Sequence, residues 1–241
     1  MKKVLISLLA VVGLWSNAAL AAEPPSAQFA TIFQFSTNQE PAVVAALAEF
    51  AQSDCRKQMP TAIHAMRESF NGSEEATHSV IWNFAEAADI TTTFGMASQC
   101  KEWAAFLAKL NDTVDPYSQI LTRTLVSGGD PSKDTTYMIW QMNVSDEATY
   151  VAEYNKLMDK QIADGLINGA YGLIRLQGGA DTSITHLAYA GAADLASLMS
   201  NANPSQAFMT FQKNVASIRT LQRQNAVSYT HLTLPTTWLV V

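Results

Sequence analysis

Few side chains in this sequence could do chemistry, and no familiar catalytic motif joins them. A histidine that titrates near neutrality can act as a general base or bind a metal, and His186 and His64 are the histidines best placed for such a role. The sequence has no paired-histidine metal motif, no Gly-x-Ser-x-Gly nucleophile motif, no phosphate-binding loop and no dinucleotide fingerprint. Whether the protein is an enzyme therefore stays open at this level.

The two cysteines, Cys55 and Cys100, can pair only if the protein folds in an oxidising compartment. In that setting an even number of cysteines predicts a disulfide, which would stabilise the fold by about 4 kcal/mol in the chain-entropy account and would remove the nucleophilic thiolate. Two buried free thiols are one alternative. A zinc site that adds His64 and His78 is another, although the short-range ligand pairs typical of zinc are missing from the sequence.

The N-terminus predicts export and so favours the disulfide. Lys2 and Lys3 precede an apolar stretch at 4–15 and an Ala-Leu-Ala-Ala exit at 19–22, a pattern typical of a cleavable signal peptide. We expect residues 1–22 to be removed and the mature protein to be periplasmic or secreted. No cysteine at the exit offers a lipid attachment point, and no later segment has the 18 apolar residues of a spanning helix, so we expect no membrane insertion after cleavage.

The last residues do not read as natural protein. The string Val-Ser-Tyr-Thr-His-Leu-Thr-Leu-Pro-Thr at 227–236 looks like a translated transposase-type sequencing adapter, so we expect 227–241 to be an artefact. A genuine apolar tail is the alternative. If the segment is an artefact, His231 and Trp238 carry no chemistry, and the true C-terminus is missing from the sequence.

The charge argues against a nucleic-acid partner. The formal net charge is -6, and loss of Lys2 and Lys3 with the signal leaves 13 basic against 21 acidic residues, a charge of -8. The basic residues are scattered singly, whereas a phosphate-binding face needs them clustered. A hydrophobic content of 48% fits a globular protein with a buried core.

An internal duplication organises the mature chain. Residues 29–35 align with 136–142, 84–89 with 189–194, 105–106 with 207–208, and 123–125 with 219–221, in the same order. We therefore expect a first repeat at 27–127, a turn-rich linker at 128–135 and a second repeat at 136–226.

Each repeat has the same predicted order of elements. The first repeat has an alternating strand at 29–35, an amphipathic helix at 41–54, strands at 62–70 and 77–85 around Asn71-Gly72, a broken helix up to about 110, and a last strand. The second repeat has a helix from Ser145, strands at 170–177 and 182–190, and a helix carrying Phe208 and Val215. The fold class is thus α+β, with two tandem β-α-β-β-α-β units of ferredoxin-like type.

Alternation along the strands predicts which side chains line the space between the two sheets. Aromatic and apolar residues of the first strands suit the helix side, which turns the equivalent residues Gln34 and Gln141 inward, where each buried amide needs a partner. The same reasoning places Asn83 and His186 inside, whereas His64 and Tyr171 occupy strands with no clear apolar face. The predicted ligand-binding residues are therefore Gln34, Gln141, Asn83, His186, His64 and Tyr171, with satisfied structural residues as the alternative for each.

The duplicated units resemble the dimeric α/β barrel superfamily, in which two ferredoxin-like sheets pack face to face. The resemblance covers about residues 27–226 and rests on element order and duplication. It implies a fused, monomeric barrel, because the second unit replaces a partner subunit. The superfamily includes antibiotic-biosynthesis-type monooxygenases and haem-handling proteins, so the resemblance implies a fold and leaves the activity open.

The function expected from the sequence is non-catalytic. We expect an exported protein that binds a small, partly apolar molecule or a partner between its two sheets. The alternative is a monooxygenase-type enzyme of the same superfamily, either free of cofactors or handling haem. No cofactor or metal is predicted from the residues themselves, and haem remains possible through the resemblance alone.

Overall fold

The strands and helices follow the predicted order twice. The computed structural model describes residues 27–179, 183–200 and 204–230. The predicted signal peptide and positions 231–241 lie outside these residues. The elements of the first unit are β1 (Phe29–Ser36), α1 (Glu40–Gln52), α2 (Asp54–Lys57), β2 (Ala62–Ser69), β3 (His78–Phe84), α3 (Ala87–Ser98), α4 (Lys101–Leu110) and β4 (Asp115–Gly128).

The second unit repeats this order after a short 3-10 turn, η1 (Pro131–Lys133), which lies within the predicted linker. Its elements are β5 (Thr136–Val144), α5 (Glu147–Ala163), β6 (Tyr171–Gly178), β7 (His186–Ala192), α6 (Leu195–Met199), α7 (Gln206–Val215) and β8 (Arg219–Tyr229). The two longer helices of the second unit start at polar caps. Asp146 accepts a hydrogen bond from the Thr149 amide at α5, and Ser205 accepts one from the Phe208 amide at α7.

The eight strands form one closed antiparallel barrel. Their order around the barrel is β1-β3-β2-β8-β5-β7-β6-β4, and β4 returns to β1. Each unit contributes four neighbouring strands, and the two sheets join where β2 pairs with β8 and β4 with β6. Closure leaves no unpaired sheet edge. The chain therefore has the dimeric α/β barrel fold with both sheets in one polypeptide.

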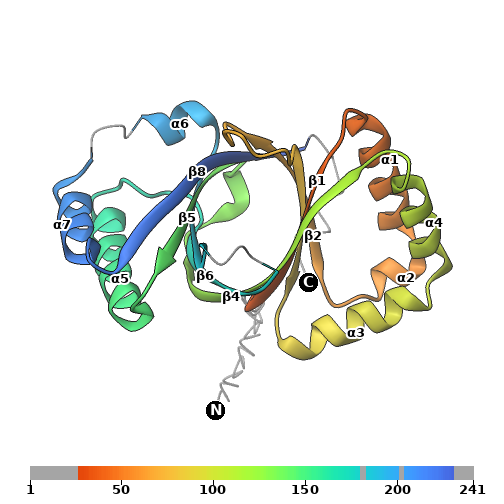
Figure 1. Ribbon diagram of the computed structural model, residues 1–241, viewed down its shortest axis with the longest axis horizontal. Helices are drawn as coiled ribbons and strands as arrows, with labels where there is room; N and C mark the ends of the chain where they lie inside the picture. Colours follow the sequence, from red (N-terminus) through yellow and green to blue (C-terminus); the bar gives the residue numbers. More distant parts are fainter. Residues whose placement is uncertain (1–26, 180–182, 201–203, 231–241) are drawn as a thin grey trace, which may run out of the picture.

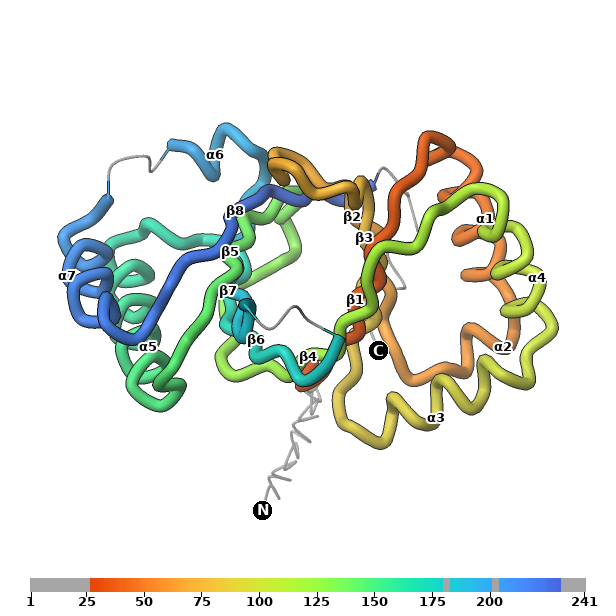
Figure 2. The backbone as a smooth tube through the Cα atoms, viewed as in Figure 1, coloured from red at the N-terminus to blue at the C-terminus, as the bar shows by residue number. Residues whose placement is uncertain are grey.

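Two groups of helices cover the outside of the barrel, one over each sheet (Figure 1). Helices α1 to α4 pack on the first sheet around Trp82 and Phe84, and α5 and α7 pack on the second around Met142 and Leu173. All four of these side chains are 2% exposed or less. The tube in Figure 2 shows the two helical groups on opposite sides of the barrel. The main apolar cores thus lie between sheet and helices, which leaves the barrel interior as a separate environment.

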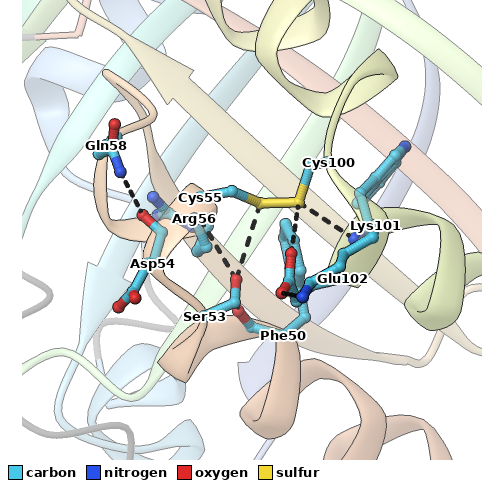
Figure 3. The surroundings of a disulfide bond; sticks show 10 residues. Phe50, Ser53, Asp54, Cys55, Arg56, Gln58, Cys100, Lys101 and Glu102 are labelled. Carbon is cyan, nitrogen blue, oxygen red and sulfur yellow. Dashed lines mark hydrogen bonds and ion pairs between the residues drawn. A yellow bond between two sulfur atoms is a disulfide. The ribbon is translucent and has the colours of Figure 1, made fainter.

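The predicted disulfide is present. Cys55 in α2 is bonded to Cys100, the residue that caps the start of α4, with Cα atoms 6.2 Å apart (Figure 3). The bond joins segments 45 residues apart and lies in the helical layer of the first unit. A free-thiol pair and a zinc site with His64 and His78 are therefore not what the structure shows at these cysteines. None of the described helices is long and apolar enough to cross a bilayer.

The register between strands fixes which residues of the two units correspond. Phe35 pairs with His78 in the first unit, and Met142 pairs with His186 in the second. Gln34 and Gln141 therefore occupy equivalent positions, as the first sequence match predicts.

Two of the other sequence matches are out of register. Phe29 pairs with Phe84 and its equivalent Thr136 pairs with Ala192, so Phe84 corresponds to Ala192 and not to Tyr189. By the same logic Arg123 corresponds to Ser228 and not to Arg219. The order of the matches is right, but local similarity misplaces these two by several residues.

Strand β8 extends into the segment that the sequence marks as adapter-like. Ser228 and Tyr229 pair with β5 and β2. Backbone pairing of this kind places little demand on side-chain identity. The artefact remains a prediction.

Candidate functional site

A polar cluster occupies one end of the barrel interior, centred on the carboxyl group of Glu68 in β2. Asn225 in β8 donates a hydrogen bond of 2.7 Å from Nδ2 to Glu68 Oε2. Gln141 in β5 in turn donates from Nε2 to Asn225 Oδ1 at 3.4 Å. Ser79 in β3 and Gln34 in β1 also hydrogen-bond the Glu68 carboxyl group. Side chains from both units therefore converge on one acid.

Burial dominates the electrostatics of this acid. Desolvation raises the pKa of Glu68 above its usual value, although the hydrogen bond from Ser79 and the charge of Arg223 work in the opposite direction. Arg223 in β8 is itself three-quarters buried or more, and burial lowers the pKa of its guanidinium, opposed by the charge of Glu68. A buried carboxyl group with a perturbed pKa inside a barrel is a candidate functional group.

The outer rim of the cluster lies where the β2–β3 hairpin meets the barrel. Glu74 in that hairpin forms an ion pair with Arg223 and accepts a hydrogen bond from the Tyr117 hydroxyl of β4. Ser118, the next residue of β4, donates a 2.7 Å hydrogen bond to Gln34 Oε1. The rim and the Glu68 cluster thus form one continuous polar end, which we call the polar end of the barrel.

The middle of the barrel is aromatic and apolar. Met66, Tyr137, Ile81, Ile139 and Tyr189 belong to one interior cluster. Burial raises the pKa of Tyr189 to about 12, so this hydroxyl is neutral at physiological pH. His64 lies in the same layer, with its ring centroid 5.8 Å from that of Tyr229, and burial lowers its pKa to about 4. The interior therefore combines a polar end with an apolar, uncharged middle.

Side chains in the barrel interior keep some water-accessible surface. Gln34, His64, Ile81 and Ile139 are only half-buried. Against the helices, by contrast, Phe84 and Leu173 are almost completely inaccessible. An eight-stranded barrel is just wide enough to be filled by side chains or to hold one small ligand. Met66, Gln141 and Asn225 in the same interior are buried, so the accessible surface is confined to part of it.

Four of the predicted site residues, Gln34, Gln141, Asn83 and His64, lie on the interior faces of their strands. Gln34 and Gln141 both face the interior and reach the Glu68 cluster. Asn83 pairs with Ala30 and Ala62 near the opposite end of the barrel, away from the cluster. His64 faces the interior in the aromatic layer. The structure therefore brings the two glutamines together and leaves Asn83 apart.

His186 does not line the interior, so its predicted orientation is wrong. It pairs with Met142, which is packed under the helices, and its Nε2 atom lies 3.0 Å from a carboxylate oxygen of Glu147 at the start of α5. The error follows from aligning β7 three residues out of register with β3. A shift by an odd number of residues moves every side chain of a strand to the opposite face.

Tyr171 also faces away from the interior. Its ring packs against the second helix–sheet core and covers Gly128 of β4, where a side chain would meet the Tyr171 hydroxyl group within 2.5 Å. The structure therefore gives Tyr171 a packing role beside a glycine and does not place it with the polar end. Glu68, Asn225 and Arg223 are the interior polar residues that sequence reasoning missed.

A second constellation missed in the sequence is duplicated on the helix-facing side. In each unit a threonine contacts Nδ1 of the next residue, a histidine, at 2.8 Å. The Nε2 atom of that histidine faces a glutamate at the start of the first helix, and the glutamate also binds an arginine of the neighbouring strand. The two sets are Thr77, His78, Glu40 and Arg67, and Thr185, His186, Glu147 and Arg175. The Thr-His dipeptide, repeated 108 residues apart, was the signal that could have found them.

Each of these two clusters connects the start of a helix to the sheet. The cluster around His186 has the shorter contact between histidine and glutamate. The Nε2 atom of His186 lies 3.0 Å from the Glu147 carboxylate, whereas His78 lies 3.5 Å from Glu40. We expect Glu147→Ala to lower the free energy of unfolding by about 1–2 kcal/mol, because it leaves a buried imidazole nitrogen without a partner. The matched change Glu40→Ala should cost less. Urea unfolding of both variants at pH 7 measures the difference, and a larger loss in Glu40→Ala would contradict this account.

Comparison with known proteins identifies the fold and little else. No protein-family profile matches the chain, and no curated protein matches it in sequence. Among solved structures, a candidate monooxygenase from Lactobacillus acidophilus superposes with a TM-score of 0.58 at 7% identity, over 85% of this chain and 93% of that one. An anthrone oxidase-like protein matches with a TM-score of 0.52 at 7% identity, over 85% of this chain and 92% of the other.

A candidate chlorite dismutase gives a TM-score of 0.53 at 5% identity, over 85% of this chain and 96% of that chain. Each match spans both units of this protein and nearly the whole of the other chain. The comparisons therefore support the two-unit dimeric α/β barrel and, at these identities, do not transfer an activity.

Proposed function

We propose that this protein binds a small, partly apolar molecule inside its barrel, with the polar group of the ligand at the polar end that contains Glu68. The observation that supports the proposal is the convergence of Gln34, Gln141 and Asn225 on this one buried carboxyl group. Binding sites are mostly apolar with a few placed polar groups. The aromatic and aliphatic middle of the barrel would contact the apolar part of the ligand.

Haem is a poor fit to the described residues. His78 and His186 both lie on the helix-facing side of the sheet, with Nδ1 against a threonine and Nε2 toward a glutamate, so neither is placed to bind a haem inside the barrel, although Nε2 of His78 makes no hydrogen bond to a described residue. His64 faces an interior that suits a small ligand, beside the ring of Tyr229. The described histidines therefore do not support a function through haem.

The first test compares two ligands that differ by one hydroxyl group. We expect 1-naphthol to bind about tenfold more tightly than naphthalene, because a hydrogen bond to a buried acid favours the hydroxyl by about 1.4 kcal/mol. Glu68→Leu should remove that preference. Fluorescence titration of the full-length protein with both compounds measures it.

The matched control is Glu49→Leu, which changes an exposed glutamate on α1, outside the barrel. It should leave the preference for 1-naphthol intact. The proposal fails if neither compound binds the unmodified protein, or if the preference survives in Glu68→Leu.

Oxygenation without a cofactor is a second candidate, favoured by the perturbed pKa of Glu68. A carboxylate in an apolar interior can accept a proton from a bound substrate. Because one structural neighbour is described as anthrone oxidase-like, anthrone is a suitable probe. Oxygen uptake that requires anthrone and is lost in Glu68→Gln would support this candidate, and no uptake above the buffer rate would leave binding alone as the proposed function.

Export and a monomeric state remain part of this proposal. The signal-like sequence at 1–22 supports export. Closure of the barrel within one chain removes the sheet edges through which single-unit proteins would pair. Size-exclusion chromatography with light scattering should give the mass of one mature chain, and a stable dimer would contradict the monomer.

A further inference from the structure

The rim of the polar end already holds a carboxylate, and this carboxylate comes from the protein itself. One oxygen of Glu74 pairs with the Arg223 guanidinium, and the other accepts a hydrogen bond from the Tyr117 hydroxyl. Tyr117 belongs to β4 and Arg223 to β8, and three strands separate these two on either side of the barrel. The carboxylate of Glu74 therefore bridges opposite walls of the barrel at its polar end.

Not every N–H donor of Arg223 has a hydrogen-bond acceptor within the described part of the chain. The Nε atom of Arg223 is buried and has no hydrogen-bond partner among the described residues. A guanidinium offers five N–H donors and pairs best with a carboxylate through two parallel hydrogen bonds. Glu74 engages it through the Nη1 atom. A free carboxylate that approaches Arg223 in a different orientation can satisfy donors that Glu74 leaves without a partner.

Glu74 reaches this position from the loop beyond the ends of β2 and β3. It lies in the hairpin between β2 and β3, and β2 runs beside β8 through the pairing of Ser69 with Ala226 (Figure 2). The hairpin backbone is held independently of Glu74 by the Asn71 side chain, which donates to the Ala76 carbonyl at 2.6 Å. Rotation of the Glu74 side chain alone would therefore vacate Arg223 without rebuilding the hairpin.

We propose that the polar end is a carboxylate-binding site, and that Glu74 occupies it until the carboxylate of a small, partly apolar ligand displaces it. This inference rests on the proposed function and specifies the class of ligand as an organic acid. Arg223 and Tyr117 would bind the carboxylate. Gln141 lies beside Arg223, its cross-strand partner on β5. The apolar part of the ligand would extend past Glu68 toward Met66 and Ile139.

The experiment measures how tightly 1-naphthoate binds when its internal competitor is removed. Glu74→Gln should raise the affinity for 1-naphthoate about tenfold, because the amide competes poorly for a charge-assisted hydrogen bond. The affinity for neutral 1-naphthol should change less than about twofold, because its hydroxyl does not compete for Arg223. The matched control is Glu75→Gln, an exposed neighbour in the same hairpin, which removes the same charge without touching Arg223.

A second variant tests the anchor itself. Arg223→Gln should lower the affinity for 1-naphthoate about tenfold or more while leaving binding of 1-naphthol within about twofold. If this variant fails to fold, the comparison of Glu74→Gln with Glu75→Gln still decides the matter.

The outcomes separate this inference from the proposed function. If 1-naphthol binds but Glu74→Gln leaves the affinity for 1-naphthoate unchanged, the carboxylate site is wrong and the interior binding site stands. An equal gain in Glu75→Gln would also overturn the site, because it would show a general effect of charge. If neither compound binds any variant, both proposals fail together.

Discussion

Removing the Cys55–Cys100 disulfide should lower the free energy of unfolding by about 4 kcal/mol. The bond closes a loop of 45 residues, and a loop of that length restricts the unfolded chain by about this amount in the chain-entropy account. Urea unfolding at pH 7 of the double variant Cys55→Ser/Cys100→Ser measures the loss against the oxidised protein. The effect is a large share of the stability of a typical domain.

Dithiothreitol provides the control for this prediction. It should destabilise the unmodified protein to the level of the double variant and should not affect the double variant. The disulfide lies in the helical layer of the first unit and not in the barrel, so affinity for an interior ligand should be unchanged while the reduced protein remains folded. A loss below about 1 kcal/mol would contradict the entropic account and indicate that the unfolded chain retains structure near the bond.

We expect acidification from pH 7 to pH 4 to remove up to about 3 kcal/mol of stability through His64 alone. Burial lowers the pKa of His64 from 6.5 to about 4 in the folded protein. The unfolded chain therefore takes up this proton first as the pH falls, and each pKa unit of difference corresponds to about 1.4 kcal/mol. The stabilisation is fully present above pH 6.5 and is lost progressively as the pH falls toward 4.

Urea unfolding of two proteins at pH 7 and pH 4 separates the contribution of His64 from those of the other titratable groups. The pKa values of His78 and His186 are also lowered, mainly by burial, and act in the same direction, whereas the raised pKa of Glu68 acts in the opposite one. We expect urea unfolding of His64→Gln to lose about 3 kcal/mol less than the unmodified protein between pH 7 and pH 4. Equal losses would show that His64 takes up its proton freely in the folded state.

The sequence predicted the fold better than the site because the two depend on different information. Local periodicity and the repeated first strand were enough for the element order and for the inward position of Gln34 and Gln141. The cluster around Glu68 joins residues as far apart as positions 68 and 225, and no local pattern contains that contact. Glu68 lies near the end of β2, where a charged residue is ordinarily expected to be exposed to solvent.

His186 shows that the face assigned to a strand residue depends on the exact alignment of the two units. The match between 84–89 and 189–194 was plausible by residue type, but the hydrogen-bonded register displaces it by three residues and turns His186 to the helices. The Thr-His dipeptides at 77–78 and 185–186 give the correct register. Tyr171 lies on a strand whose faces both carry apolar side chains, so alternation could not orient it.

The most direct test of the central proposal is to locate the residues that a bound ligand contacts. Met66 faces the barrel interior and Met142 faces the helices, and both are at least 97% buried, so they form a matched pair of reporters. Methyl NMR of protein labelled with carbon-13 at the methionine methyl groups, recorded during titration with 1-naphthol, separates the two locations. We predict that the Met66 methyl resonance shifts with saturable ligand dependence while that of Met142 stays in place. A shift of Met142 with Met66 unmoved would contradict binding inside the barrel and place the ligand under the helices.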